Sequence, residues 1–231
     1  MKRFWTTAAV VPSEGGFCVA LDGRPVRTPA RAPLLLPTRA LADAIAGEWD
    51  AQGQTINPRA MPLTGLANAA IDRVAPDAHA FAARLAAYGE SELIAYRADG
   101  PDSLLAAQAQ AWDPWAAWFA RRFDAALTQT RGIMHVAQPP ETLARIRAAF
   151  ATFTPFQLAA LDPVVGITGS AVLALAVAEG LMDADSAHDA AHVDARWQEE
   201  QWGRDELAAK AESARRADLA SAVRFLRLLA G

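Results

Sequence analysis

The sequence predicts an α+β protein, with a small N-terminal antiparallel β unit (residues 1–37) followed by a larger all-helical domain (residues 38–231). Short apolar runs separated by turn residues fill the first segment. The Asp22-Gly23 pair within it is a strong signal for a two-residue hairpin loop. Beyond residue 37 apolar residues recur at helical spacing, and prolines follow good helix-capping residues. These observations place the β structure first and the helices after it.

The β unit is expected to contain four short strands. Gly15-Gly16 and Asp22-Gly23 separate the first three of them. Proline cannot donate a hydrogen bond to a sheet, so Pro25, Pro29 and Pro33 disfavour a central position for the strands that carry them. The expected strands are residues 3–11, 17–21, 24–28 and 32–36.

The first helix is expected to begin after Thr38, whose hydroxyl can cap it, and to run to about Ala51. Leu41, Ile45 and Trp49 recur every four residues and would form its apolar face. The elements expected next are helices at residues 62–74 and 77–88 and a short strand or extended connector at residues 92–97.

Prolines mark the later helix boundaries. A proline costs almost nothing at the first helical position but disrupts a helix interior. Asp113-Pro114, Thr154-Pro155 and Asp162-Pro163 are therefore each expected to start a helix or to kink a longer one. Gln157 completes the capping-box pattern that begins with Thr154.

The C-terminal segment carries most of the acidity of the chain. Residues 183–229 are expected to form two long helices, with Gly203 and the region of Ser213 as candidate joints. Ten acidic and five basic side chains lie in residues 183–218, whereas the whole chain has a net charge of −4. Such a segment is either an ordinary solvated helix face or a surface that steers a basic partner. The negative total argues against a nucleic-acid backbone as the main partner.

Composition disfavours two further classes of protein. The single cysteine, Cys18, cannot form an intrachain disulfide, which fits a reducing compartment. The longest apolar stretch, residues 164–178, is short and interrupted by glycine and hydroxyl residues, so it is expected to be a buried helix without membrane insertion. The N-terminal residues lack the apolar core of a signal peptide.

Two histidines are the candidates for a metal site. His188 and His192 are four residues apart and could share one helix face, as zinc ligands do. Asp189 stands where a metalloprotease helix has glutamate, and Asp185 is a possible third ligand. Two exposed histidines on an acidic helix are the preferred interpretation, so no metal and no cofactor are expected.

No recognisable catalytic constellation is present in the sequence. Residues 166–169 (GITG) lack the lysine of a phosphate-binding loop, and Ser170 lacks the second glycine of a nucleophile elbow. Cys18 lies in a strand pattern and is expected to be a buried residue. Glu199 and Glu200 are adjacent on a helix and diverge by about 100°, unlike the facing carboxylates of a glycosidase. No catalytic residue is predicted, and the chain is not expected to be an enzyme.

Aromatic residues supply candidates for a binding surface. Trp118 and Trp202 lie off the apolar faces of their helices, where a tryptophan is either second-layer core or an exposed interface anchor. The stripe from which Trp118 departs is expected to be core; its members are Trp112, Trp115, Phe119 and Phe123.

Eight segments together resemble the family of assembly chaperones for the alpha subunit of the F-type ATP synthase, found in mitochondria and alpha-proteobacteria. The resemblance depends on their order and spacing over nearly the whole chain. Ser91 and Glu92 stand where the family has threonine and aspartate, and Ala95 where it often has cysteine. The segments are residues 3–5 (RFW), 21–29 (LDGRPVRTP), 48–49 (EW), 61–64 (MPLT), 67–72 (ANAAID), 90–97 (ESELIAYR), Gln108 with 112–114 (WDP), and 199–203 (EEQWG).

The resemblance implies a β-rich domain followed by a helical one, with no enzymatic activity. It implies that the partner is the newly made alpha subunit, bound before that subunit joins the beta subunit. Such a subunit exposes a large interface that can aggregate. A chaperone would cover this interface and then yield to the true partner. Eukaryotic relatives would act in the mitochondrial matrix, and the lack of a targeting segment here points to the bacterial cytoplasm.

The client-binding residues are expected mainly on the acidic C-terminal helix, at Glu199, Glu200 and Trp202. Further expected contacts are Asp72, Arg73 and Arg97. Asp72 could instead form an ordinary ion pair with a nearby arginine.

Three further expectations complete the prediction. Asp113 is expected to cap a helix rather than to contact a client. Two rival functions stay open: an enzyme with an unrecognised pocket, and a small-ligand or metal-binding helical protein that uses His188 and His192.

Overall fold

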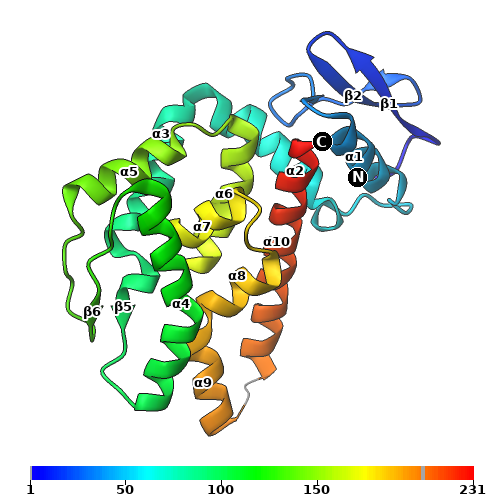
Figure 1. Cartoon of the computed structure of the whole chain (residues 1–231). Coiled ribbons are helices and arrows are strands. Elements are labelled where there is room, and N and C mark those ends of the chain that lie inside the picture. Colours follow the sequence, from blue (N-terminus) through cyan, green and yellow to red (C-terminus); the bar gives the residue numbers. More distant parts are fainter. Residues whose placement is uncertain (1, 204–205) are drawn as a thin grey trace. The chain divides into compact units, whose positions relative to one another are not determined.

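The computed structural model describes residues 2–203 and 206–231, which fall into two compact units (Figure 1). The first unit contains the chain up to Ala78 together with Thr154–Ala160 and Ser221–Gly231. The second unit contains His79–Phe153 and Leu161–Ala220. A small N-terminal antiparallel sheet followed by a mostly helical region confirms the predicted fold class.

The sheet of the first unit is built around β2 (Gly16–Leu21). β1 (Ala8–Ser13), β3 (Arg24–Pro25) and β4 (Leu35–Leu36) each pair antiparallel with it. The predicted hairpin loop is present between β2 and β3. Its two residues, Asp22 and Gly23, both have positive φ, at 46° and 81°, as the favoured two-residue hairpin turn requires.

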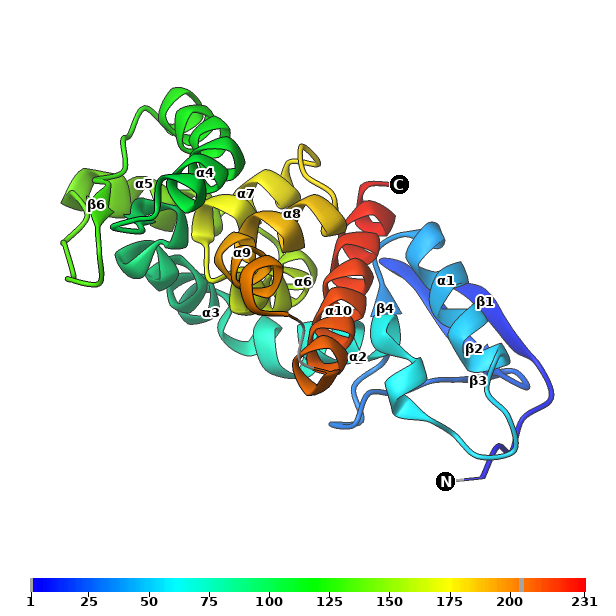
Figure 2. The same ribbon diagram turned by 90° about the horizontal axis from the view of Figure 1, so that it is seen from below.

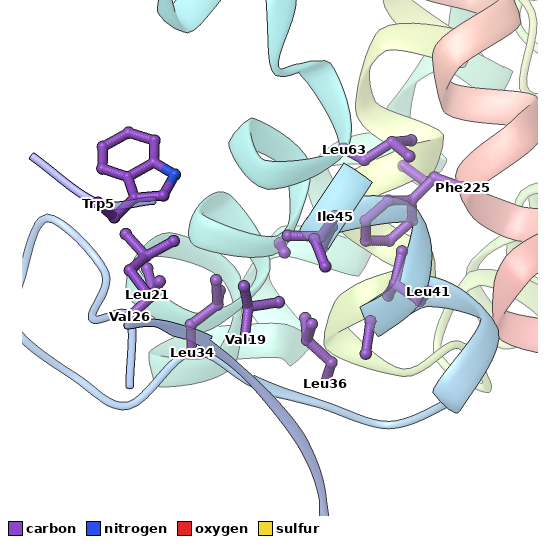
Figure 3. Close-up of a cluster of buried hydrophobic side chains, with 14 residues drawn as sticks. Trp5, Val19, Leu21, Val26, Leu34, Leu36, Leu41, Ile45, Leu63 and Phe225 are labelled. Atoms are coloured by element: carbon purple, nitrogen blue, oxygen red, sulfur yellow. The ribbon is translucent and has the colours of Figure 1, made fainter. Parts of the chain in front are cut away.

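The core of the first unit lies between this sheet and α1 (Arg39–Asp50) (Figure 2). Thr38 caps α1 as predicted: its hydroxyl oxygen accepts from the Leu41 N–H at 3.2 Å and its hydroxyl donates to the Leu228 carbonyl at 2.6 Å. Phe225, near the C-terminus, enters the same cluster (Figure 3). Its ring also stacks on that of Phe156. Because α1 and these distant segments complete the core, the compact unit extends beyond the expected boundary at residue 37.

A helical stretch follows α1 in the first unit, and it is less regular than predicted. Pro58–Ala60 forms a 3-10 turn and α2 spans Pro62–Ala69. The backbone then continues as a π-helical segment, Ala70–Val74, and a 3-10 turn, Ala75–Asp77, so the helix expected at residues 62–74 changes type after Ala69.

The second unit is helical apart from one small parallel ladder between β5 (Tyr96–Arg97) and β6 (Thr130–Arg131). The apolar helix α7 (Ala171–Ala178) is buried, and α4, α5 and α8 all pack against it. The elements before α7 are α3 (Ala78–Ala86), the 3-10 turns Ala87–Ser91 and Leu93–Ala95, α4 (Asp102–Phe123), α5 (Pro140–Phe150) and α6 (Pro155–Thr168).

Proline acts as a helix boundary at one of the three predicted places. Thr154 and Gln157 form the expected capping box at the start of α6, with the Gln157 side-chain oxygen 2.9 Å from the Thr154 nitrogen. The 22-residue helix α4 instead runs through Asp113 and Pro114, and Pro163 lies inside α6. Asp113 is therefore not a helix cap. Pro114 is exposed, so its ring does not disturb the core.

The described residues of the acidic C-terminal segment form three helices where two were predicted. They are α8 (Ala184–Ala191), α9 (Val193–Trp202) and α10 (Glu206–Ala230). The unpredicted break falls at His192, whose φ and ψ of −116° and 27° interrupt the helix. Gly203 ends α9 with a φ of 91°, as expected of a joint, whereas Ser213 lies inside α10.

Candidate functional site

The candidate site is a groove of about 610 Å³ in the second unit, between α4 and the α8–α9 pair. Trp115 from α4, Met182 from the turn before α8, and Trp197 from α9 give it apolar walls. Asp189, Arg196 and Glu200 supply its charged groups. A mixed apolar and charged groove of this size suits a segment of another protein.

Buried polar contacts hold α9 and the end of α8 against α4. The Trp112 indole donates to the Ala190 carbonyl at 2.6 Å. The Gln108 side-chain nitrogen donates to the Asp194 carboxylate at 2.7 Å, and its oxygen accepts from the Ala98 N–H at 2.9 Å. Gln108 and Trp112 are almost fully buried, so these bonds fix the groove walls in a low-dielectric interior.

The expected residues Glu199, Glu200 and Trp202 share the last turn of α9, but their side chains do not point the same way. Glu200 is exposed and lines the groove. Glu199 is half-buried and lines a separate hollow of about 100 Å³ beside Arg215. This divergence follows from the angle of about 100° between adjacent positions on a helix.

Trp202 is 75% exposed, which resolves the open alternative in favour of a surface position. Its ring meets the edge of Trp197 at a centroid distance of 5.8 Å. Trp197 donates its indole N–H to the Ser103 hydroxyl at 3.1 Å and is thereby fixed on the groove wall. Trp118 is half-buried between Trp115 and Phe123, as second-layer core.

Asp72 and Arg73 lie in the π-helical segment of the first unit. The Asp72 carboxylate accepts from the Thr28 hydroxyl at 2.7 Å and from the Ala30 N–H at 3.0 Å, so it closes the loop after β3. Its described partners are these two groups and not an arginine. Arg73 is exposed.

Arg97 is buried, with 9% of its surface exposed, and lies in the second unit on β5. Its guanidinium lies 2.8 Å from the carboxylate of Asp113, which is in the interior of α4. The six expected client-binding residues therefore fall into three groups: the end of α9, the Asp72–Arg73 pair and Arg97.

The two histidines are engaged in structural contacts. His188 is buried and stacks on His192 at a centroid distance of 4.0 Å. Its Nδ1 accepts from Arg216, and Arg216 also binds Asp185 and Asp189 at 2.8 Å each. Burial lowers the pKa of His188, and the charges of His192 and Arg216 act in the same direction.

The prediction of two exposed histidines is therefore wrong, because His188 is buried and His192 is half-buried. Within residues 2–203 and 206–231, no cluster of three or more His, Cys, Asp or Glu side chains could hold a metal ion. Arg216 contacts Nδ1 of His188, and the ring stacks on His192, so the contacts of His188 in the described structure are with its own chain.

Sequence reasoning missed Trp115 and Met182 as groove residues. Trp115 belongs to the aromatic stripe that was assigned wholly to the core, although half-buried aromatics at a stripe edge often line grooves. Met182 carried no signal, since its place in the groove depends on the turn that joins α7 to α8.

No helix in the described part of the chain is both long enough and apolar enough to cross a membrane.

A small N-terminal antiparallel sheet followed by a mostly helical region is the fold of the solved Atp12 structures that match this chain. The chain belongs to the ATP12 chaperone family: the model of the ATP12 chaperone protein matches residues 2–120. Its members are named as chaperones, which are not enzymes, so the prediction that the chain is not an enzyme is confirmed. The predicted family resemblance is confirmed as well.

Solved structures of this family share the fold over nearly the whole chain. Atp12 from Paracoccus denitrificans is 46% identical, with a TM-score of 0.95 and coverage of 99% of this chain and 98% of that chain. A form of that protein with one aspartate replaced by lysine has the same identity and TM-score, with 97% of its chain covered. The Atu1473 protein from Agrobacterium tumefaciens is 41% identical, with a TM-score of 0.94, over 99% of this chain and 86% of that chain.

A eukaryotic relative is more distant in sequence. The mitochondrial protein atp12 of Schizosaccharomyces pombe is 25% identical over 214 residues, which cover 87% of this chain and 74% of that protein.

Proposed function

We propose that this protein binds the unassembled alpha subunit of the F-type ATP synthase and shields its interface until the beta subunit joins. Membership of the ATP12 chaperone family supports a role in assembly of that enzyme. The observation that carries the proposal is the end of α9, where Trp202 is 75% exposed beside the Trp-lined groove that Glu200 also lines. A large exposed aromatic next to a groove is typical of protein-binding surfaces.

The chemistry of the groove suits an apolar client segment that carries a basic residue. Trp197 and Trp115 offer apolar area, and Glu200 offers an exposed carboxylate at the groove edge. An exposed carboxylate contributes mainly to the rate of encounter and to orientation, whereas a buried aromatic contributes most of the affinity. We therefore assign the client's apolar anchor to the tryptophans and its basic residue to Glu200.

The remaining expected contacts have different places in this proposal. Glu199 lies beside Arg215 in the smaller hollow and would help to set the charge around α9. Asp72 and Arg73 form a second candidate contact on the first unit, in which Arg73 would touch the client and Asp72 would position the loop after β3. Arg97 is buried, so a client could reach it only through the pocket that it lines.

The exchange of partners needs no nucleotide in this proposal. The chaperone covers the client interface with moderate affinity, and the beta subunit then displaces it by binding the same interface more tightly. We place this activity in the bacterial cytoplasm. The identities of 46% and 41% to alpha-proteobacterial proteins, against 25% to a mitochondrial one, support that placement.

The test is co-purification of tagged protein from its own host, with Glu200→Lys compared to wild type. Glu200 is exposed, so its reversal should leave the fold intact. Glu199 is half-buried and has an intramolecular partner, which makes it a poorer choice. Glu14→Lys is the matched control, because Glu14 is an exposed carboxylate in the turn between β1 and β2 and its reversal changes the net charge equally.

Recovery of the ATP synthase alpha subunit with wild type and Glu14→Lys, but reduced with Glu200→Lys, would support both the client and the site. Equal recovery with all three proteins would support the client and reject the site. If no alpha subunit is recovered with any of them, from cells shown to be making it, the proposed client is wrong.

A further inference from the structure

A second pocket of the helical unit, of about 560 Å³, lies between the β5–β6 ladder and α4. Arg97, Asp113, Thr130 and Arg131 supply most of its polar groups. The pocket joins two of the sequence segments that carry the family resemblance, since residues 90–97 contribute Arg97 and residues 112–114 contribute Asp113.

The Arg97 guanidinium is buried at this pocket with part of its hydrogen-bonding capacity unused. Its Nη2 lies 2.8 Å from Asp113 Oδ1, which is an ion-pair distance. Neither Nη2 nor Nε makes an aligned hydrogen bond to any described residue, although both atoms are buried. The guanidinium also lies over the Trp112 ring, 5.2 Å from its centroid. The Nε–H of this buried guanidinium has no acceptor among the described residues, so the group is suited to a further acceptor.

A second arginine stands beside the first. β5 and β6 pair in parallel with Arg97 opposite Arg131, so the two side chains leave neighbouring positions of one ladder. Arg131 is exposed and makes no ion pair with a residue of the described chain. Like charges opposite each other are unfavourable unless an anion lies between them.

The charge of the pocket favours one monoanion. Two guanidiniums and the Asp113 carboxylate leave an excess of one positive charge. Asp99 is a further carboxylate close in sequence to Arg97. Its Oδ2 would lie 2.7 Å from a Cβ at Gly132, and it does not line the pocket. A carboxylate carries the matching single charge, and its two oxygens fit the planar fork of an arginine.

Gln129 also lines the pocket, the other lining residues are apolar, and the volume of about 560 Å³ is larger than a free carboxylate requires. Leu105 and Ala109 are four residues apart on α4 and form one wall, with Ala106 beside them. We propose that this pocket is a carboxylate-binding subsite, which takes the acidic side chain of a bound polypeptide together with its small apolar neighbours. The polypeptide part of this inference rests on the proposed function, whereas carboxylate recognition by Arg97 and Arg131 does not.

The test is direct titration of the full chain with a matched pair of peptides, acetyl-Ala-Leu-Glu-Ala-amide and acetyl-Ala-Leu-Gln-Ala-amide. The Arg97 Nε–H resonance in the NMR spectrum reports occupancy of the pocket by the peptide. This resonance is assigned as the signal that is missing from the spectrum of Arg97→Lys. The Glu peptide is expected to move this resonance saturably at millimolar concentration, and the Gln peptide is not. Arg131 is an exposed side chain, so Arg131→Gln should not disturb folding. This substitution is expected to weaken binding of the Glu peptide about tenfold. Arg121→Gln, an exposed arginine near the end of the same helix α4, is the control and should have no effect.

Equal binding of the two peptides, or no shift with either, would overturn carboxylate recognition. Tighter binding of inorganic phosphate with the same dependence on Arg131 would overturn the choice of anion. Propionate binding as tightly as the Glu peptide would overturn the polypeptide part. These readouts need no alpha subunit, so their failure is distinct from a failure of the co-purification.

Discussion

The carboxylate of Glu92 accepts a hydrogen bond from the main-chain N–H of Ala171 at 2.9 Å, at the start of the buried helix α7. The same oxygen accepts from the Val172 N–H at 3.1 Å. Glu92 is fully buried, and burial raises the pKa of its carboxyl to about 7, although these hydrogen bonds act against the rise. One carboxylate thus satisfies two main-chain donors that the first turn of a helix leaves unpaired.

The raised pKa of Glu92 predicts that stability falls as pH rises from about 4.5 to about 7. In this range the unfolded chain has lost the proton, since its reference pKa is 4.5, while the folded chain still holds it. Folding is then linked to proton uptake, and the contribution lost is on the order of 3 kcal/mol. Glu92→Gln does not titrate, so the difference in free energy of unfolding between the two proteins should change over this range.

Urea unfolding of wild type and Glu92→Gln at pH 5, 6, 7 and 8 measures that difference, because the other titrating groups cancel between the two proteins. A difference that stays constant across the four pH values would show that Glu92 has an ordinary pKa in the folded protein.

Features set by neighbours in sequence could be predicted from the sequence. The Asp22-Gly23 turn, the Thr38 cap and the Thr154–Gln157 capping box each depend on residues within a few positions, and all three are present. Features set by distant residues could not. The ion pair of Asp113 with Arg97 depends on how α4 packs, and no local pattern distinguishes it from a cap.

The candidate site shows the same limit. Helical spacing indicated that Trp202 lies off the face of its neighbour Trp197, but its exposure depends on where α9 ends and what packs there. The divergence of Glu199 and Glu200 followed from helix geometry alone. The groove itself could not be predicted, because α4 and α9 are far apart in sequence and Gln108 with Asp194 brings them together.

Trp202→Ala is expected to weaken client capture about tenfold or more, with little change in stability. An exposed tryptophan contributes little to the folded core but can contribute about 2 kcal/mol at the centre of an interface. Pull-down at graded client concentrations, together with thermal unfolding, separates the two effects. Trp202→Phe is the graded variant and should retain much of the binding. A loss of melting temperature comparable to that of a core substitution would show that Trp202 is structural.

Glu48→Ala is expected to destabilise the first unit by about 2 kcal/mol. The Glu48 carboxylate accepts from the Leu63 and Thr64 N–H groups at 2.8 Å each and from the Thr64 hydroxyl at 2.7 Å, and so caps α2 across 14 intervening residues. Loss of a helix cap costs about 0.5–2 kcal/mol, and a charged acceptor lies at the upper end. Chemical denaturation measures the change. Glu14→Ala is the control, and an equal effect of both would exclude the capping role.

Asp72 and Arg73 are adjacent in the chain, and their variants are expected to separate stability from binding. Asp72→Ala removes the acceptor of the Thr28 hydroxyl, which is buried, and of the Ala30 N–H, so the free energy of unfolding should fall by about 2 kcal/mol. Arg73→Ala removes an exposed side chain and should leave stability unchanged within about 0.5 kcal/mol. If Arg73 touches the client, only its variant lowers capture per folded molecule. Thermal unfolding and pull-down on the same preparations measure both quantities.

Unchanged capture by Arg73→Ala would remove the first unit's contact from the proposed client surface. Unchanged stability of Asp72→Ala would show that the loop after β3 does not need that carboxylate.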